Sequence, residues 1–170
     1  MLFVGVDPGA FGAFALLKRN AESFSGLTVY PMPRLMVRVG KTDRPRVDLH
    51  GCSTLGRVIC AAEPQFAVIE QVQGFGKQDA AGAFVFGRAT CAAEMALIGS
   101  DCPLRYVAPA KWKTELGISK EKENAVLEAK RLFPAFADQF DSVRGVRTQE
   151  QAIGNAEAAL LAYYGATKLP

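Results

Sequence analysis

The chain opens with three short apolar runs of the kind that form β-strands, and turn-forming residues separate them. The runs cover residues 2–6, 11–18 and 27–30. The first run stops at Asp7-Pro8-Gly9, where proline fixes φ and glycine relaxes it. This spacing predicts a three-stranded antiparallel meander over the first thirty residues.

The hydrophobic period then changes from strand-like to helical. Residues 47–63 carry apolar positions at helical spacing, end at Pro64 and lead into the apolar run 66–70. A long stretch at 80–98 is rich in alanine and glycine, which is typical of a closely packed helix. Residues 104–107 resemble a fifth strand. Residues 31–46 have no period, and we expect a basic loop there.

Three more helices are predicted in the C-terminal part, over residues 109–116, 122–132 and 150–164. The order βββ-α-β-α-β-α-α-α predicts an α/β fold with a five-stranded mixed sheet, three antiparallel strands followed by two parallel ones, flanked by helices. The first strand should be central, with the fourth parallel beside it. A length of 170 residues suits a single domain spanning residues 1–170.

Composition narrows the possible chemistry. With 49% hydrophobic and 22% charged residues, the chain resembles an ordinary globular protein. Four cysteines without a CxxC pair and a single histidine, His50, argue against a zinc knuckle or a histidine-based triad. No uninterrupted apolar run approaches about 18 residues, and the N-terminus lacks a basic region. We therefore expect no signal peptide, no membrane partner and a cytoplasmic location.

The net charge of +3 conceals two basic clusters, at residues 34–46 and 105–122. Both lie in segments that contain proline and glycine. Basic segments beside a folded core are suited to the phosphate backbone of a nucleic acid, although a solvated surface has the same pattern.

Acidic residues end two of the predicted strands. Asp7 and Glu70 each follow a buried apolar run, so two parallel neighbours would bring them close together. Taken singly, they also fit a turn cap and a surface acid. In the last helix, Glu157 lies within an apolar stripe that carries no lysine or arginine. A buried carboxylate needs a partner, and carboxylates without histidine or cysteine favour Mg²⁺, with Mn²⁺ as a substitute. Such ions can drive attack of water on a phosphodiester.

Four motifs in order carry a family resemblance: VGVDPG, VIEQV, PAKWKTELGISKEK and NAEAALLAYYG. Together they resemble the RuvC family of Holliday junction resolvases over nearly the whole chain. The resemblance implies an RNase H-like fold, a homodimer, and Mg²⁺-dependent paired nicking of four-way DNA junctions in recombination, repair or phage DNA processing.

The resemblance also implies roles for individual residues. Asp7, Glu70 and Glu157 correspond to the family's metal-binding acids, and Phe75 corresponds loosely to an aromatic that opens base stacking. Lys113 and Lys122 resemble its backbone-contacting lysines, with Lys111 as an alternative to Lys113. The full set expected to bind DNA is Phe75, Lys77, Arg88, Lys111, Lys113, Lys120 and Lys122.

One departure from the family pattern concerns a further acid or histidine, usually three to five residues before the position of Glu157. Here that window is Ala152-Ile153-Gly154, which offers no side-chain ligand. Glu150 is the candidate substitute; Asn155 is another, but on a regular helix it points about 160° away from Glu157. A junction-binding or branched-DNA-binding protein with a weakened or inactive catalytic site is the alternative. A phosphotransferase of the actin and sugar-kinase type is disfavoured because the first turn lacks serine or threonine.

Overall fold

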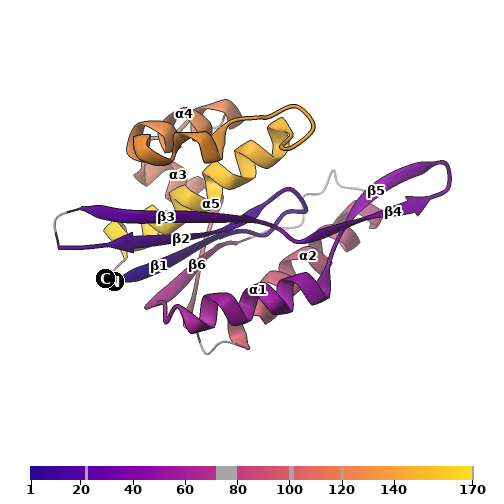
Figure 1. Cartoon of the computed structure of the whole chain (residues 1–170), viewed down its shortest axis with the longest axis horizontal. Coiled ribbons are helices and arrows are strands. Elements are labelled where there is room, and N and C mark those ends of the chain that lie inside the picture. Colours follow the sequence, from indigo (N-terminus) through magenta and orange to yellow (C-terminus); the bar gives the residue numbers. More distant parts are fainter. Residues whose placement is uncertain (22, 72–79, 100–101, 120, 170) are drawn as a thin grey trace.

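A computed structural model describes residues 1–21, 23–71, 80–99, 102–119 and 121–169. Its main sheet has the strand order β3-β2-β1-β6-β7 (Figure 1). The strands are β1 (Leu2–Asp7), β2 (Ala13–Arg19), β3 (Phe24–Pro31), β6 (Phe66–Glu70) and β7 (Leu104–Val107). Strand β1 pairs antiparallel with β2 and parallel with β6. The predicted mixed sheet and its central first strand are confirmed.

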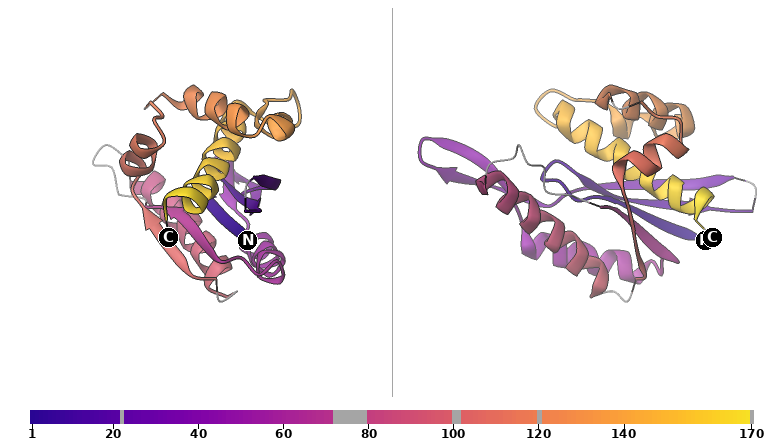
Figure 2. Two further views of the ribbon diagram at one scale, coloured as in Figure 1. Left: turned by 90° about the vertical axis from the view of Figure 1, so that its left-hand side faces the viewer. Right: turned by 180° about the vertical axis from the view of Figure 1, so that it is seen from behind.

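Helices cover both faces of this sheet (Figure 2). One face carries α1 (Leu49–Ala61) and α2 (Ala80–Ile98). The other carries α3 (Pro109–Glu115), α4 (Lys122–Leu132) and α5 (Gln149–Lys168), with a short 3-10 helix at Pro134–Phe140. Each face has its own buried hydrophobic cluster, so the sheet separates two cores.

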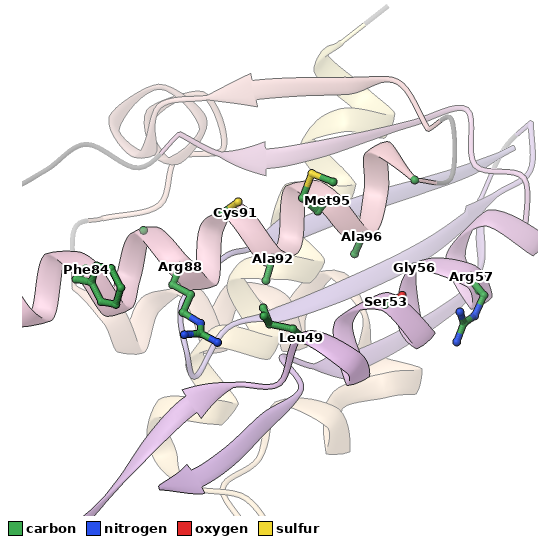
Figure 3. A pocket seen from close by; sticks show the side chains of 12 residues that line it. Leu49, Ser53, Gly56, Arg57, Phe84, Arg88, Cys91, Ala92, Met95 and Ala96 are labelled. Atoms are coloured by element: carbon green, nitrogen blue, oxygen red, sulfur yellow. The ribbon is translucent and has the colours of Figure 1, made fainter. Parts of the chain in front are cut away.

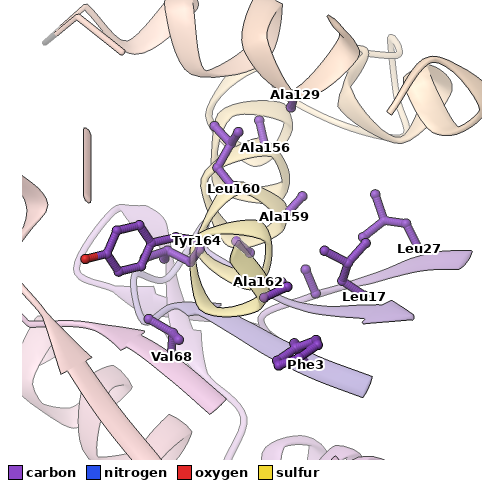
Figure 4. Packing of buried hydrophobic residues seen from close by; sticks show 14 of the residues in the cluster. Phe3, Leu17, Leu27, Val68, Ala129, Ala156, Ala159, Leu160, Ala162 and Tyr164 are labelled. Atoms are coloured by element: carbon purple, nitrogen blue, oxygen red, sulfur yellow. The ribbon is translucent and has the colours of Figure 1, made fainter. Parts of the chain in front are cut away.

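Helix α5 lies directly on the centre of the sheet. Phe3, Leu17 and Val68 point from the strands toward Leu160 and Ala162 of the helix (Figure 4). The approach is so close that a Cβ added at Gly5 would lie 2.1 Å from the Ala158 carbonyl oxygen. The absence of a side chain at Gly5 therefore lets α5 lie against β1, which determines where Glu157 lies.

The same packing explains why α5 extends beyond its predicted end. The sequence predicted that this helix ends at residue 164, before Gly165, but the helix continues to Lys168. A Cβ at Gly165 would lie 2.8 Å from Val68 Cγ2 and 3.2 Å from the Phe66 ring. This glycine serves close contact with β6 rather than helix termination.

Helix α2 differs from the sequence-based expectation about membranes. Among the described residues, it is long and apolar enough by length and composition to cross a membrane, with a hydropathy of 1.3. Residues 80–98 do not form an uninterrupted apolar run, because Arg88 and Glu94 lie among the apolar residues. One side of the helix, including Ala93 and Leu97, is buried in the core beneath the sheet. Its opposite side is apolar and exposed.

The segment expected to be a basic loop is instead a β-hairpin. Strands β4 (Arg34–Val39) and β5 (Thr42–Val47) pair antiparallel and form a separate two-stranded sheet. Gly40 takes the positive φ of 62° that the turn between them requires. The pattern was missed because Met36 breaks the apolar alternation and Pro45 lies within the second strand, where proline is tolerated only at an edge.

Candidate active site

Three carboxylates gather where β1 and β6 end. Asp7 is the last residue of β1, and Glu70 is the last residue of the parallel neighbour β6, whose Ile69 pairs with Val6. Glu157 reaches the same region from α5, and its charge raises the pKa of both other acids. The predicted proximity of Asp7 and Glu70, and the inward position of Glu157, are thus observed in the structure.

The site carries more negative charge than its surroundings neutralise. Burial raises the pKa of Asp7 from 3.8 to about 7, and the charges of Glu157 and Glu70 add to that effect. The Gly9 amide, which donates to Asp7 Oδ1 at 3.1 Å, lowers it only partly. Burial also raises the pKa of Glu70, assisted by Glu157. A positive charge placed among these groups would favour their ionised forms.

Lys113 supplies part of that positive charge. Its Nζ lies 2.6 Å from Glu157 Oε1, and the two side chains are only 19% and 14% exposed. The stripe on α5 carries no lysine or arginine, as expected, but Glu157 has a basic partner from another helix. Its partner comes from α3, whereas the sequence argument considered only the stripe on its own helix.

Trp112 holds the second acid from the same short helix. The indole is fully buried, and its Nε1 donates to Glu70 Oε1 at 2.9 Å. Lys113 Nζ lies 5.1 Å from the centre of the indole ring. Helix α3 is fixed against α5 because Tyr164 donates to Glu115 Oε2 at 2.9 Å. In the sequence, the adjacent Trp and Lys in PAKWKTELG are the signal for these two contacts.

The donor chemistry of the three acids suits a hard divalent cation, because all the available oxygens are carboxylate oxygens. Their present arrangement is not that of a loaded site: among the described residues, no group of three His, Cys, Asp or Glu side chains lies close enough to hold an ion. Glu157 faces Lys113, and Glu70 faces Trp112. Lys113 and a cation bound by all three acids would therefore share the Glu157 carboxylate. Mg²⁺ stays a prediction.

The window that lacks the family's further acid is packed tightly against the turn after Asp7. A Cβ at Gly154 would lie 2.0 Å from the Phe11 carbonyl oxygen. Asn155 is buried, donates from Nδ2 to the Gln139 carbonyl at 2.9 Å and accepts from Gln151 Nε2 at 2.9 Å. Its amide is therefore engaged in holding α5 in place.

Glu150, the other candidate substitute ligand, is exposed in the first turn of α5. Seven residues separate it from Glu157, which is about 10 Å of helix rise. A role for Glu150 as a ligand stays a prediction.

The residues expected to bind DNA are dispersed. Lys113 lies with the acids, whereas Lys111 is exposed on α3. Arg88 lies in a groove between α1 and α2, across from Leu49 (Figure 3). Lys122 begins α4. Phe75, Lys77 and Lys120 lie outside the described residues. The DNA-binding roles of these residues stay predictions.

Comparison with solved structures shows that the chain shares the α/β fold of RuvC. The Thermus thermophilus RuvC structure matches 99% of this chain and 98% of its own, with a TM-score of 0.62 and 16% identity. Thermus thermophilus RuvC in complex with Holliday junction substrate matches the same shares, with a TM-score of 0.60 and 16% identity.

The yeast mitochondrial Holliday junction resolvase matches 94% of this chain and 75% of its own, with a TM-score of 0.55 and 12% identity. No family model and no curated protein matches the sequence. The chain therefore has a RuvC-like fold, and the resemblance noted in the motifs is confirmed at the level of the fold.

Proposed function

We propose that this protein is a structure-selective endonuclease that binds four-way DNA junctions and resolves them by paired, metal-dependent nicking. The observation that carries the proposal is the convergence of Asp7, Glu70 and Glu157 at one end of the sheet. The fold shared with RuvC, including RuvC bound to a Holliday junction substrate, supports branched DNA as the substrate.

In this proposal Asp7, Glu70 and Glu157 would hold Mg²⁺, or Mn²⁺ in its place. Bound there, the ion would supply activation of water and charge stabilisation for the leaving oxygen of the phosphodiester. The Gly9 amide orients the Asp7 carboxylate, and the Trp112 indole orients that of Glu70. Lys113, released from Glu157, is in position to donate to a phosphate oxygen at the same site.

Paired nicking of two strands calls for a symmetric dimer, and the outer side of α2 is the surface that supports one. Phe84, Met95 and Ile98 are 71%, 60% and 53% exposed there. Phe84 and Met95 line a groove of about 880 Å³ between α1 and α2 (Figure 3). This exposed side is largely apolar and also carries Arg88, which lines the groove, and such a surface suits a self-complementary interface.

A second candidate is a junction-binding protein with a weakened catalytic site. Two observations favour it: Lys113 occupies the Glu157 carboxylate, and residues 152–154 supply no further side-chain ligand. Such a protein would keep the shape of the site for recognition and would bind metal weakly.

Cleavage of a synthetic four-way junction distinguishes the two candidates. For the nuclease, we expect symmetric nicks in Mg²⁺ or Mn²⁺ and none with the Asp7→Asn or Glu70→Gln variants. Junction binding without nicking in either metal, unchanged by Asp7→Asn, would establish the binding protein instead. A linear duplex of the same sequence serves as the substrate control.

A further inference from the structure

The β4–β5 hairpin projects beyond the main sheet from the end at which β1 finishes (Figure 1). It carries five basic residues and a single acid, and most of its residues are exposed. Neither strand pairs with the main sheet. An isolated two-stranded ribbon is marginally stable in water, so both its anchoring and its surface need an explanation.

The base of the hairpin is anchored to the active-site region. Arg34 donates from Nη1 to Gln151 Oε1, and its guanidinium lies 4.8 Å from the centre of the Phe11 ring. Gln151 in turn donates from Nε2 to the carbonyl oxygens of Phe11 at 3.2 Å and Gly12 at 3.0 Å. Arg34 is therefore used internally, and it connects the ribbon to α5 and to the turn that follows Asp7.

Three other basic residues of the hairpin have no such internal use. Within the described part of the chain, Lys41, Arg44 and Arg46 form no ion pair, whereas Arg38 pairs with Asp43 at 3.3 Å. Arg44 and Arg46 pair across the ribbon with Val37 and Leu35, so they share one face of it. Those partners are 41% and 55% exposed.

This basic face adjoins the turn that carries the first acid. Arg44 and Arg46 border a hollow of about 500 Å³ together with Ala10, three residues after Asp7, and with Val85 and Phe86 of α2. A nucleic-acid backbone that passes the three acids would therefore reach the basic face of the β4–β5 hairpin.

We propose that the hairpin is an arm that binds the phosphate backbone of one duplex arm of the junction through Lys41, Arg44 and Arg46. The proposal rests on the proposed function for its choice of DNA. Six residues per strand give a ribbon of about 20 Å, which corresponds to roughly six base pairs of duplex. A ribbon of two strands also has the width that the major groove admits.

The charge of the hairpin indicates that its basic face binds DNA rather than the hairpin of a second copy of the chain. Two copies would bring the same excess of arginine and lysine together, and like charges oppose pairing. Each cation that meets a phosphate instead releases condensed counterions. The apolar Leu35 and Val37, beside the arginines, then contact the sugar and base edges without competing for the phosphates.

The test compares Arg44→Gln/Arg46→Gln with a matched control, Lys18→Gln/Lys168→Gln. The control removes two exposed cations near the opposite end of the sheet, where the chain termini lie. Affinity for a linear duplex is measured without divalent metal across a salt series. We expect the hairpin variant to lower the slope of log K against log salt by about two and to bind roughly tenfold more weakly at physiological salt. The control should match the wild type.

The conservative variant Arg44→Lys/Arg46→Lys should have the salt slope and the duplex affinity of the wild type, because phosphate contact depends on charge. Junctions with arms shorter than about six base pairs should not distinguish the hairpin variant from the wild type. Equal slopes for the hairpin and control variants would overturn the proposal. So would loss of self-association with unchanged DNA affinity, since the hairpin would then bind another copy.

The same series separates this proposal from the proposed function. Absence of junction nicking by the wild type would count against the nuclease, whatever the hairpin does. A salt slope on linear duplex that depends on Arg44 and Arg46 would still establish the arm.

Discussion

The Lys113 ammonium lies 2.6 Å from the Glu157 carboxylate, at the point where three acids converge. In this position the lysine neutralises part of a cluster in which burial and mutual repulsion raise the pKa of Asp7 to about 7. The side chain thus acts as an internal counterion. It occupies one of the carboxylates that a divalent cation would use.

Removing this counterion should weaken the fold and increase the response to metal. Lys113→Met leaves Glu157 largely buried without its partner, and we expect a loss of about 1–3 kcal/mol of unfolding free energy in a metal-free buffer. Mg²⁺ should then raise the melting temperature of the variant more than that of the wild type, because no ammonium competes for Glu157. Thermal melts with and without Mg²⁺ measure both effects.

The control for this prediction is the neighbouring Lys111→Met, since Lys111 is exposed. It should leave both the metal-free stability and the Mg²⁺ response as in the wild type. Equal responses of the two variants would contradict the role of Lys113 as a counterion.

Asp7 predicts how stability depends on pH without metal. Its pKa rises from 3.8 to about 7 on folding, so between these values the folded state binds more protons than the unfolded state. Stability should therefore fall as pH increases from about 4 to about 7. Asp7→Asn should flatten this decline and be more stable than the wild type at pH 8, by up to about 4 kcal/mol. Urea unfolding at pH 5 and pH 8 measures it.

The exposed Asp43→Asn serves as the control and should keep the wild-type pH dependence. Glu70 also has a raised pKa, so some decline should persist in Asp7→Asn. A wild-type slope in Asp7→Asn would show that its carboxyl is not the group responsible.

The main sheet was predictable from the sequence because each strand is a local apolar run bounded by turn residues. Asp7 and Glu70 followed from that, since parallel neighbours bring their C-terminal ends together. The Lys113 and Trp112 contacts were not predictable in the same way. They depend on how α3 packs against α5, and that is decided by tertiary contacts such as the one between Tyr164 and Glu115.

The hairpin escaped prediction for a different reason. Its strands are exposed, so no buried face imposes an alternation of apolar and polar residues. Its position is set by Arg34, whose partners Gln151 and Phe11 are far away in the sequence. The sequence therefore predicted the basic cluster at residues 34–46 but not the β-hairpin that carries it.

Trp112 should influence catalysis through Glu70. Trp112→Phe keeps an aromatic ring in the core but removes the indole N–H, whose hydrogen bond lowers the pKa of Glu70. We therefore expect junction nicking to need a higher pH and to be about tenfold slower at neutral pH. Rates of nicking across a pH series measure this, with a thermal melt to verify folding. An unchanged pH profile would limit Trp112 to packing.

Gly5 tests whether the contact between β1 and α5 holds the site together. Gly5→Ala places a Cβ 2.1 Å from the Ala158 carbonyl oxygen, so the helix must move away from the strand. We expect a loss of at least about 3 kcal/mol by urea unfolding. Gly26→Ala is the matched control, because its Cβ would lie 3.7 Å from Lys18 Cβ, which is ordinary contact. Similar losses in both variants would refute the argument.

The exposed side of α2 provides the test of the proposed dimer. Phe84→Glu/Met95→Glu places two charges on this apolar surface without disturbing the buried side of the helix. If two copies pack through α2, the variant should sediment as a monomer at concentrations at which the wild type is a dimer. Leu127→Glu is the control, because Leu127 is 65% exposed on α4. Since paired nicking needs both active sites, the α2 variant should also produce single nicks in place of coupled ones. A dimeric α2 variant would move the interface to another surface.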